Sequence, residues 1–358
     1  MKKERQSNIE LLKIFAMIGI IILHCNNVEI GGAFKYAQMP SLKAYALYYL
    51  ECMAISAVDV FMLISGYFMV VSEKIDLKKP LRLLIQVALF REMFYLYHGV
   101  MGRTEINLIE MVIQLLPASY FVVLYVAVYL LSPFINHLMR SLHEKGLKAL
   151  MIVVVLLISV WPYGADVLEH IGKRSFLGLS TIGMYGSQSG YTLVNFIMMY
   201  MIGAYLRITG AKGKKLACGA VLVSSWTMMF ILSIWLVGRD VSAHLAWEYC
   251  SPLVIVSAVS AFLLFDGIRI KSNAVINSLA KATFSVYLFN SDLILLLFNA
   301  KEHVSGNGVM MLLHIAWTCV VTCLVCWAIQ CAYDWLMKPV YSFIDKYLKL
   351  KTVFSLEE

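Results

Sequence analysis

Residues 9–25, IELLKIFAMIGIIILHC, indicate the fold class of this chain. The run is apolar along most of its length and approaches the roughly 20 residues that a helix needs to cross a bilayer. At about 100° per residue, Glu10, Lys13 and His24 fall on one helix face, with about 16 Å of rise between Lys13 and His24. A titratable imidazole is costly in apolar surroundings, so this face is a candidate functional site.

The composition of the whole chain extends this pattern. Of the 358 residues, 61% are hydrophobic and only 15% are charged, whereas a soluble domain has about 25% charged residues. We therefore predict an all-α, polytopic transmembrane helical bundle of about ten spans. The apolar segments are 9–25, 44–71, 81–100, 119–139, 147–163, 190–208, 216–237, 249–268, 277–299 and 309–331.

The basic residues predict the orientation of these spans. Most of the 30 Lys and Arg lie in alternate connections, on the side that also holds the N-terminus. By the positive-inside rule, both termini are cytoplasmic and the chain is a multi-pass protein of the cytoplasmic membrane. We attribute the net charge of +8 to this topology and predict no nucleic-acid partner. Residues 1–335 form the predicted membrane domain, and residues 336–358 a basic amphipathic tail on the cytoplasmic surface.

Three further features bear on the boundaries and on metal binding. The first apolar run begins like a signal peptide, but Lys13 interrupts it, so we predict an uncleaved first span. Residues 108–116 predict a short interfacial helix before Pro117, and the glycine-bearing residues 164–189 an external loop. The eight cysteines are predicted to be packing residues, and no metal site is predicted.

Polar residues in the second span and after it suggest chemistry. Asp59 lies about as far from the outer end of its span as His24 lies from the inner end of the first, which permits a His24–Asp59 dyad without requiring one. Ser65 and Gly66 approach the cytoplasmic surface near the basic turn 78–82, KKPLR. This arrangement suits a phosphate-bearing ligand. The alternatives are a helix-packing notch at Ser65-Gly66 and a pure topology signal at the basic turn.

Taken together, these motifs resemble those of the acyltransferase-3 family of integral membrane O-acyltransferases. The resemblance rests on the first-span pattern RQSNIELLK at 5–13 with His24, and on DVFMLISGYF at 59–68 with the basic turn that follows. Weaker matches cover 120–136, 195–207 and 284–289.

The resemblance implies transfer of an acyl group, usually acetyl, from cytoplasmic acyl-CoA to a hydroxyl of a cell-surface or exported polysaccharide. Acetyl-CoA is then the donor substrate, and the partners are a saccharide acceptor and the lipid bilayer. The implied catalytic group is His24, supported by Asp59, Lys13 and Glu10. The implied acyl-CoA-binding residues are Arg82, Lys78, Lys79, Ser65 and Gly66.

Two positions depart from the family pattern and leave alternatives open. Lys13 stands where Arg is usual, and Lys lacks the planar fork of Arg. Asn290 stands where a His often follows Tyr287, so we assign it a hydrogen-bonding role at most. A non-catalytic family member is therefore one alternative. A lipid-linked saccharide flippase is another, although few cationic residues lie within the spans to receive a pyrophosphate.

Overall fold

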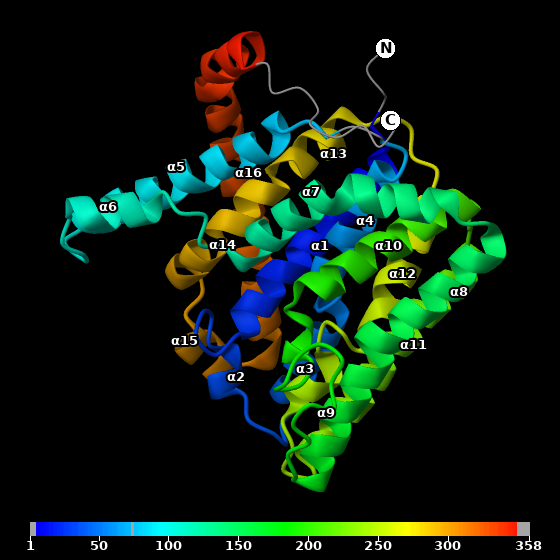
Figure 1. Ribbon diagram of the computed structural model, residues 1–358. Coiled ribbons are helices and arrows are strands. Elements are labelled where there is room, and N and C mark those ends of the chain that lie inside the picture. Colours follow the sequence, from blue (N-terminus) through cyan, green and yellow to red (C-terminus); the bar gives the residue numbers. More distant parts are fainter. Residues whose placement is uncertain (1–4, 73–74, 349–358) are drawn as a thin grey trace. The chain divides into compact units, whose positions relative to one another are not determined.

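The computed structural model describes residues 5–72 and 75–348, and helices are the only extended regular structure in these residues. This confirms the predicted all-α, polytopic bundle (Figure 1). Eight helical stretches are long and apolar enough to cross a membrane. They are Ser7–Asn26, Leu42–Met69, Tyr120–Ser141, Glu144–Gly172, Lys215–Val237, Ala243–Asp266, Ala274–Leu297 and Gly308–Tyr347.

The other two predicted spans are also helical. α10 (Leu193–Thr209) is apolar but has only 17 residues. α5 (Lys78–Val100) has 23 residues, and charged side chains such as Arg91 and Glu92 lower its mean hydropathy. Each of the ten apolar segments thus corresponds to a helix or to two or three successive helical elements.

The chain divides into two compact units. Unit 1 comprises residues 1–68 and 142–331, and unit 2 comprises residues 69–141 and 332–358. In unit 1, α1 (Ser7–Asn26) packs against α3 (Leu42–Ala54), α12 (Pro252–Asp266) and α14 (Thr283–Leu297). The remaining elements wholly within unit 1 are α2 (Ala33–Tyr36), α8 (Glu144–Val155), η1 (Leu156–Val160), α9 (Trp161–Gly172), η2 (Gln188–Gly190), α10, α11 (Lys215–Val237), η3 (Ala243–Trp247), α13 (Ala274–Leu279), η4 (Ala280–Ala282) and α15 (Ala300–Ser305).

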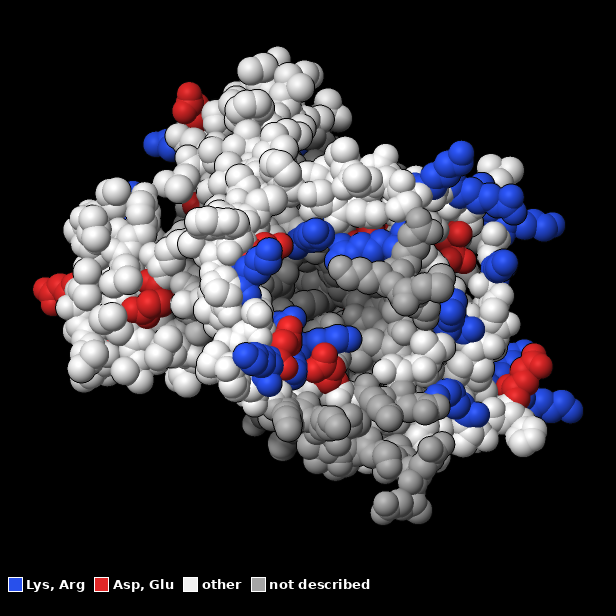
Figure 2. Space-filling model, turned by 90° about the horizontal axis from the view of Figure 1, so that it is seen from above, with Lys and Arg blue, Asp and Glu red and all other residues white. Residues whose placement is uncertain are grey.

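Hydrogen bonds define which helix ends lie together in unit 1. Near the start of α1, Ser7 Oγ bonds Asn277 Oδ1 in α13 at 2.9 Å, and Asn8 Nδ2 donates to Phe265 O in the last turn of α12 at 3.0 Å. We call this the inner end, after the predicted topology, and the end at which α1 and α14 finish the outer end. Figure 2 looks onto the face at which α1 begins, where Lys and Arg side chains are numerous.

Unit 2 contains α5, α6 (Leu108–Gln114), α7 (Tyr120–Ser141) and the last part of α16 (Gly308–Tyr347). α6 confirms the predicted short helix before Pro117. α4 (Ala57–Met69) ends at the boundary between the units. α16 runs without a break through the predicted tail boundary at residue 336, and the part of that tail from residue 349 onward lies outside the described residues.

The predicted external loop at 164–189 is wrong in its first part. Residues 164–172 belong to α9, which continues α8 and η1 in one stretch from Glu144 to Gly172. η1 is a π-helical turn directly before Pro162. Such a turn accommodates a residue that has no backbone N–H, so the helix passes the proline instead of ending there.

Two glycines set the contact between α4 and α10. A Cβ on Gly66 would lie 1.9 Å from the carbonyl oxygen of Tyr200, and a Cβ on Gly203 would lie 2.0 Å from that of Leu63. The two backbones approach each other where side chains are absent, as is common between membrane helices. Gly66 therefore serves as a packing notch, one of the two interpretations of the sequence.

We expect Gly66→Ala to destabilise the protein by about 3 kcal/mol or more, because the added methyl group meets main-chain atoms that cannot rotate away. The thermal midpoint of the detergent-solubilised protein measures this effect. Gly219→Ala in α11 is the matched control, since its Cβ would meet nothing within 4 Å. An unchanged midpoint for Gly66→Ala would contradict the described contact.

Candidate active site

The candidate site lies where α1 and α14 pack together near the outer end of unit 1. His24 is in the last turn of α1, and Asn290 is fully buried in α14. The Nδ1 atom of His24 is hydrogen-bonded to Oδ1 of Asn290 and lies 3.4 Å from Oγ of Ser291. The imidazole is thus fixed to a helix that is 266 residues distant in the sequence.

The side-chain amide of Asn290 defines the protonation of this imidazole. Its Nδ2 donates to the carbonyl oxygens of Val286 and Tyr287, at 2.9 and 2.8 Å. A reversed amide would place its oxygen against those two carbonyl oxygens, so Oδ1 is the atom that faces His24. Since Oδ1 can only accept, Nδ1 of His24 carries the hydrogen, and in the neutral imidazole Nε2 therefore keeps its lone pair. This tautomer is the one that a general base acting through Nε2 requires.

Glu10 and Lys13, which were predicted to share a helix face with His24, form an ion pair with each other at a distance from the histidine. Lys13 Nζ lies 3.1 Å from Oε1 of Glu10, and Arg5 Nη1 lies 4.0 Å from Oε2 of Glu10. Glu10 is buried, with 9% of its surface exposed. Because Lys13 lies about 16 Å along the helix from His24, these residues form a separate cluster toward the inner end.

Asp59 has a different partner from the one that the sequence allowed. It lies in the first turn of α4, just after the break that separates α4 from α3. Its Oδ1 accepts from Nδ2 of Asn195 at 3.3 Å, and it is 1% exposed. The hydrogen bonds of His24 go to α14 instead, so the structure does not form a His24–Asp59 dyad. Asp59 Oδ2 and Asn195 Oδ1 are buried without a hydrogen-bond partner.

Ser65 and the basic turn complete the predicted set. Ser65 Oγ donates to the carbonyl of Phe61 at 2.8 Å, a bond within α4. In unit 2, Arg82 and Lys78 in α5 both pair with Asp345 near the end of α16, the Lys78 Nζ–Asp345 Oδ1 distance being 3.7 Å. The guanidinium of Arg82 also lies 4.9 Å from the centre of the Tyr341 ring. Lys79 is exposed.

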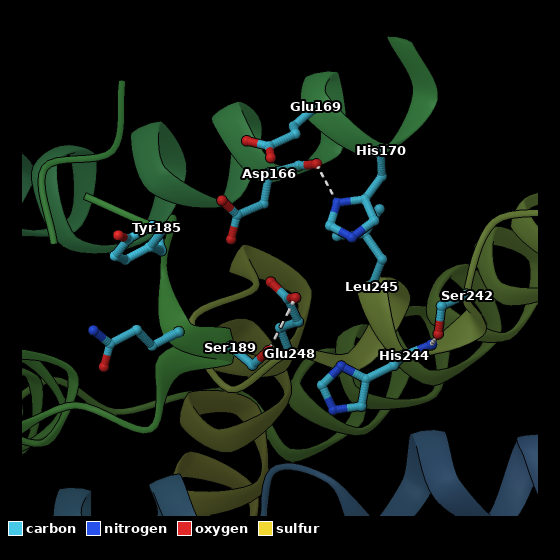
Figure 3. A pocket seen from close by; sticks show the side chains of 10 residues that line it. Asp166, Glu169, His170, Tyr185, Ser189, Ser242, His244, Leu245 and Glu248 are labelled. Carbon is cyan, nitrogen blue, oxygen red and sulfur yellow. Dashed lines mark hydrogen bonds between the residues drawn. The ribbon is translucent and has the colours of Figure 1, made fainter. Parts of the chain in front are cut away.

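Two pockets open at the outer end of unit 1. The first, which we call the His170 pocket, has a volume of about 290 Å³ and is shown in Figure 3. Asp166 and His170 of α9 point into it from one side, and His244 and Glu248 from the other. Glu248 accepts hydrogen bonds from the hydroxyls of Ser187 and Ser189. These residues were not among the candidates from the sequence, because separate segments of the chain that share no motif line the pocket.

The second pocket, which we call the α1–α14 pocket, has a volume of about 520 Å³. It is lined by residues 28–32, 35–36 and 295–301. These segments directly follow the turns that carry His24 and Asn290. The pocket therefore lies just outside the candidate site.

Neither a metal-ligand group nor a disulfide is found in the described residues. Within residues 5–72 and 75–348, no group of three or more His, Cys, Asp or Glu side chains is arranged to hold a metal ion. All eight cysteines are free.

These observations describe a polytopic helical membrane protein with an oriented histidine at a helix pair. Comparison with known families gives the class: the acyltransferase-3 family, described as an acyltransferase domain, matches residues 6–331. The match covers most of the chain, so this protein belongs to the acyltransferase-3 family and is a membrane acyltransferase. No curated protein and no solved structure matches the chain.

The tautomer of His24 can be measured directly. We expect ¹⁵N NMR of histidine-labelled protein, at a pH where the imidazole is neutral, to show a hydrogen on Nδ1 and an unprotonated Nε2. Asn290→Ala should abolish this preference because it removes the acceptor. The resonance is assigned as the one that is missing in His24→Ala. A hydrogen on Nε2 in the unsubstituted protein would disprove the proposed geometry.

Proposed function

We propose that this protein is an O-acetyltransferase of the cytoplasmic membrane, which moves an acetyl group from cytoplasmic acetyl-CoA to a hydroxyl of a cell-surface or exported polysaccharide. Membership of the acyltransferase family supports the reaction class. The single observation that carries the mechanism is the hydrogen bond from His24 Nδ1 to Asn290, which leaves Nε2 free to take a proton.

The chemistry follows from the two reactants. A thioester is already activated, so the protein has to deprotonate the acceptor hydroxyl and stabilise the oxyanion that forms. His24 Nε2 takes the hydroxyl proton as the acceptor oxygen attacks the thioester carbonyl. The tetrahedral intermediate then collapses, the carbon–sulfur bond breaks and the proton passes to the CoA sulfur. Asn290 Oδ1 stabilises the transient imidazolium by accepting from Nδ1.

The same free Nε2 also serves a two-step route. In that route Nε2 attacks the thioester carbonyl, the carbon–sulfur bond breaks, and CoA leaves as the thiolate while His24 carries the acetyl group. The acceptor hydroxyl then attacks this acetyl group, the carbon–nitrogen bond breaks, and the hydroxyl proton neutralises the thiolate. Both routes need the same tautomer. They differ in whether an acetylated form of the protein accumulates when no acceptor is present.

We assign the phosphates of the donor to Arg82, Lys78 and Lys79. A guanidinium fork suits bidentate phosphate binding, and the ammonium groups add charge. Asp345 supplies the carboxylate that a phosphate would replace on Arg82 and Lys78. Ser65 stays in this proposal as a neighbour of the donor, whereas Gly66 contributes through helix packing.

We assign supporting roles in the reaction to three further residues, Glu10, Lys13 and Asp59. The Glu10–Lys13 pair would place charge along the inner half of α1, on the side from which the donor comes. The unpartnered Oδ2 of Asp59 would accept a hydrogen bond from a substrate or a water molecule.

His24→Ala should lower kcat for acetyl transfer by about 10²- to 10⁴-fold, the range that a general base contributes. The measurement is CoA release by purified protein in detergent, with thermal midpoints as the check on folding. His137→Ala in α7 is a control for removing a membrane-helix histidine. Full acetyl-transfer activity of His24→Ala would contradict the proposed mechanism.

Arg82→Gln should raise KM for acetyl-CoA by about tenfold and change kcat little, because it removes a charge-assisted phosphate contact. In the same assay, dephospho-CoA thioesters, which lack the 3′-phosphate, show whether Arg82 contacts that phosphate or the diphosphate. Arg140→Gln, at the last turn of α7, is the matched control. An unchanged KM in Arg82→Gln would remove the basic turn from the donor site.

A further inference from the structure

The α1–α14 pocket is built on the same two helices as the candidate site. One wall is the segment 28–36, which follows α1, and the other is the segment 295–301, which includes the end of α14. Leu295 is five residues after Asn290, a rise of about 7.5 Å along a helix. The pocket thus begins little more than one helical turn beyond the His24–Asn290 pair.

The first wall is also hydrogen-bonded to the catalytic residue itself. The backbone N–H of Gly31 donates to the carbonyl oxygen of His24 at 2.9 Å, so the loop folds back over the end of α1. This approach needs glycine, because a Cβ on residue 31 would lie 2.4 Å from the carbonyl oxygen of Cys25. The loop is therefore held in a fixed place directly outside His24.

The charges in the pocket favour one kind of ligand. Lys35 comes from one wall and Lys301 from the other, and both side chains are exposed. Neither takes part in the ion pairs found in the described part of the chain. The nearby Lys43, by contrast, donates to the carbonyl oxygens of Val304, Ser305 and Gly306 and so caps a helix end. Two ammonium groups from the two lining segments, without an ion pair to a protein carboxylate, suit a negatively charged ligand.

The other features suit a sugar. A volume of about 520 Å³ is within the usual range for small-ligand sites. Tyr36 is 42% exposed, and its ring is an apolar surface suited to the C–H groups of a pyranose. Glu29 and Asn299 supply hydrogen-bonding groups for hydroxyls.

We propose that the α1–α14 pocket binds the acceptor as a saccharide unit with a negatively charged group, which Lys35 and Lys301 hold while a hydroxyl is directed toward His24. This inference rests on the proposed function and adds the chemical class of the acceptor to it. The His170 pocket is a poor site for the same ligand, since three carboxylates, Asp166, Glu169 and Glu248, line it.

The test measures binding separately from catalysis. The probes are methyl β-D-glucuronide, methyl β-D-glucoside 6-phosphate and neutral methyl β-D-glucoside, titrated into the purified full-length His24→Ala protein by saturation-transfer NMR. We expect both anionic probes to bind at least tenfold more tightly than the neutral one. Lys35→Gln and Lys301→Gln should each weaken anionic binding by about tenfold and leave neutral binding unchanged. A preference between the two anionic probes distinguishes a carboxylate from a phosphate.

Two matched controls fix the location. Arg174→Gln removes an outer-side charge that lines neither pocket, and Glu169→Gln alters the His170 pocket. Neither should weaken anionic binding. Equal affinity for the charged and neutral probes, or insensitivity to both lysine substitutions, would overturn the inference. Lysine-dependent binding without acetylation of any probe by the unsubstituted protein would uphold the pocket and count against the proposed function instead.

Discussion

The hydrogen bond between His24 Nδ1 and Asn290 Oδ1 is the interaction on which the chemistry of this protein depends. It joins α1 to α14 across 266 positions of sequence. It exists in one orientation only, because the carbonyls of Val286 and Tyr287 occupy both amide hydrogens of Asn290. The backbone carbonyls of α14 thus fix the orientation of the Asn290 amide, and that amide fixes the tautomer of the His24 imidazole. In this tautomer Nε2 is the nitrogen that can accept a proton.

The surrounding bundle keeps its buried polar groups in similar pairs. Asn26, two residues after His24, donates to the carboxylate of Glu51 in α3 at 2.8 Å. Ser285 donates to Gln330 on α16 within unit 1. Unpaired polar groups are costly in hydrocarbon, so each such pair favours one register between neighbouring helices. Several polar pairs between neighbouring helices therefore fix the rotation of α1 about its axis, and with it the direction in which His24 points.

Sequence alone predicted the fold well, because hydrophobic length is a local property. The ten apolar segments all became helices, and Glu10 and Lys13, predicted to lie on one face of the first span, form an ion pair there. The loop start at residue 164 was wrong because α9 continues through Gly164 to Gly172. The glycines in this stretch suggested a loop, but a glycine within a helix costs only about 1 kcal/mol relative to alanine.

The partner of His24 was harder to predict. Their similar depth in the membrane allowed Asp59 as a partner of His24. Depth does not say which helices are neighbours, however, and in the structure the partner of His24 lies on α14. The hydrogen-bonding role assigned to Asn290 agrees with the structure, although its partner was not foreseen. The same limit applies to Gly66, whose contact with α10 depends on which backbone lies opposite. Both outer pockets are assembled from separate segments, so neither has a continuous sequence signature.

The most direct measurement is an experimental structure of the protein with a non-transferable acetyl-CoA analogue bound. We expect Nδ1 of His24 to stay on Asn290 and Nε2 to face the analogue at the position of the thioester carbonyl, with room beside it for an acceptor oxygen. An analogue bound with its acyl end far from His24, or an imidazole turned so that Nε2 contacts Asn290, would contradict the proposed mechanism.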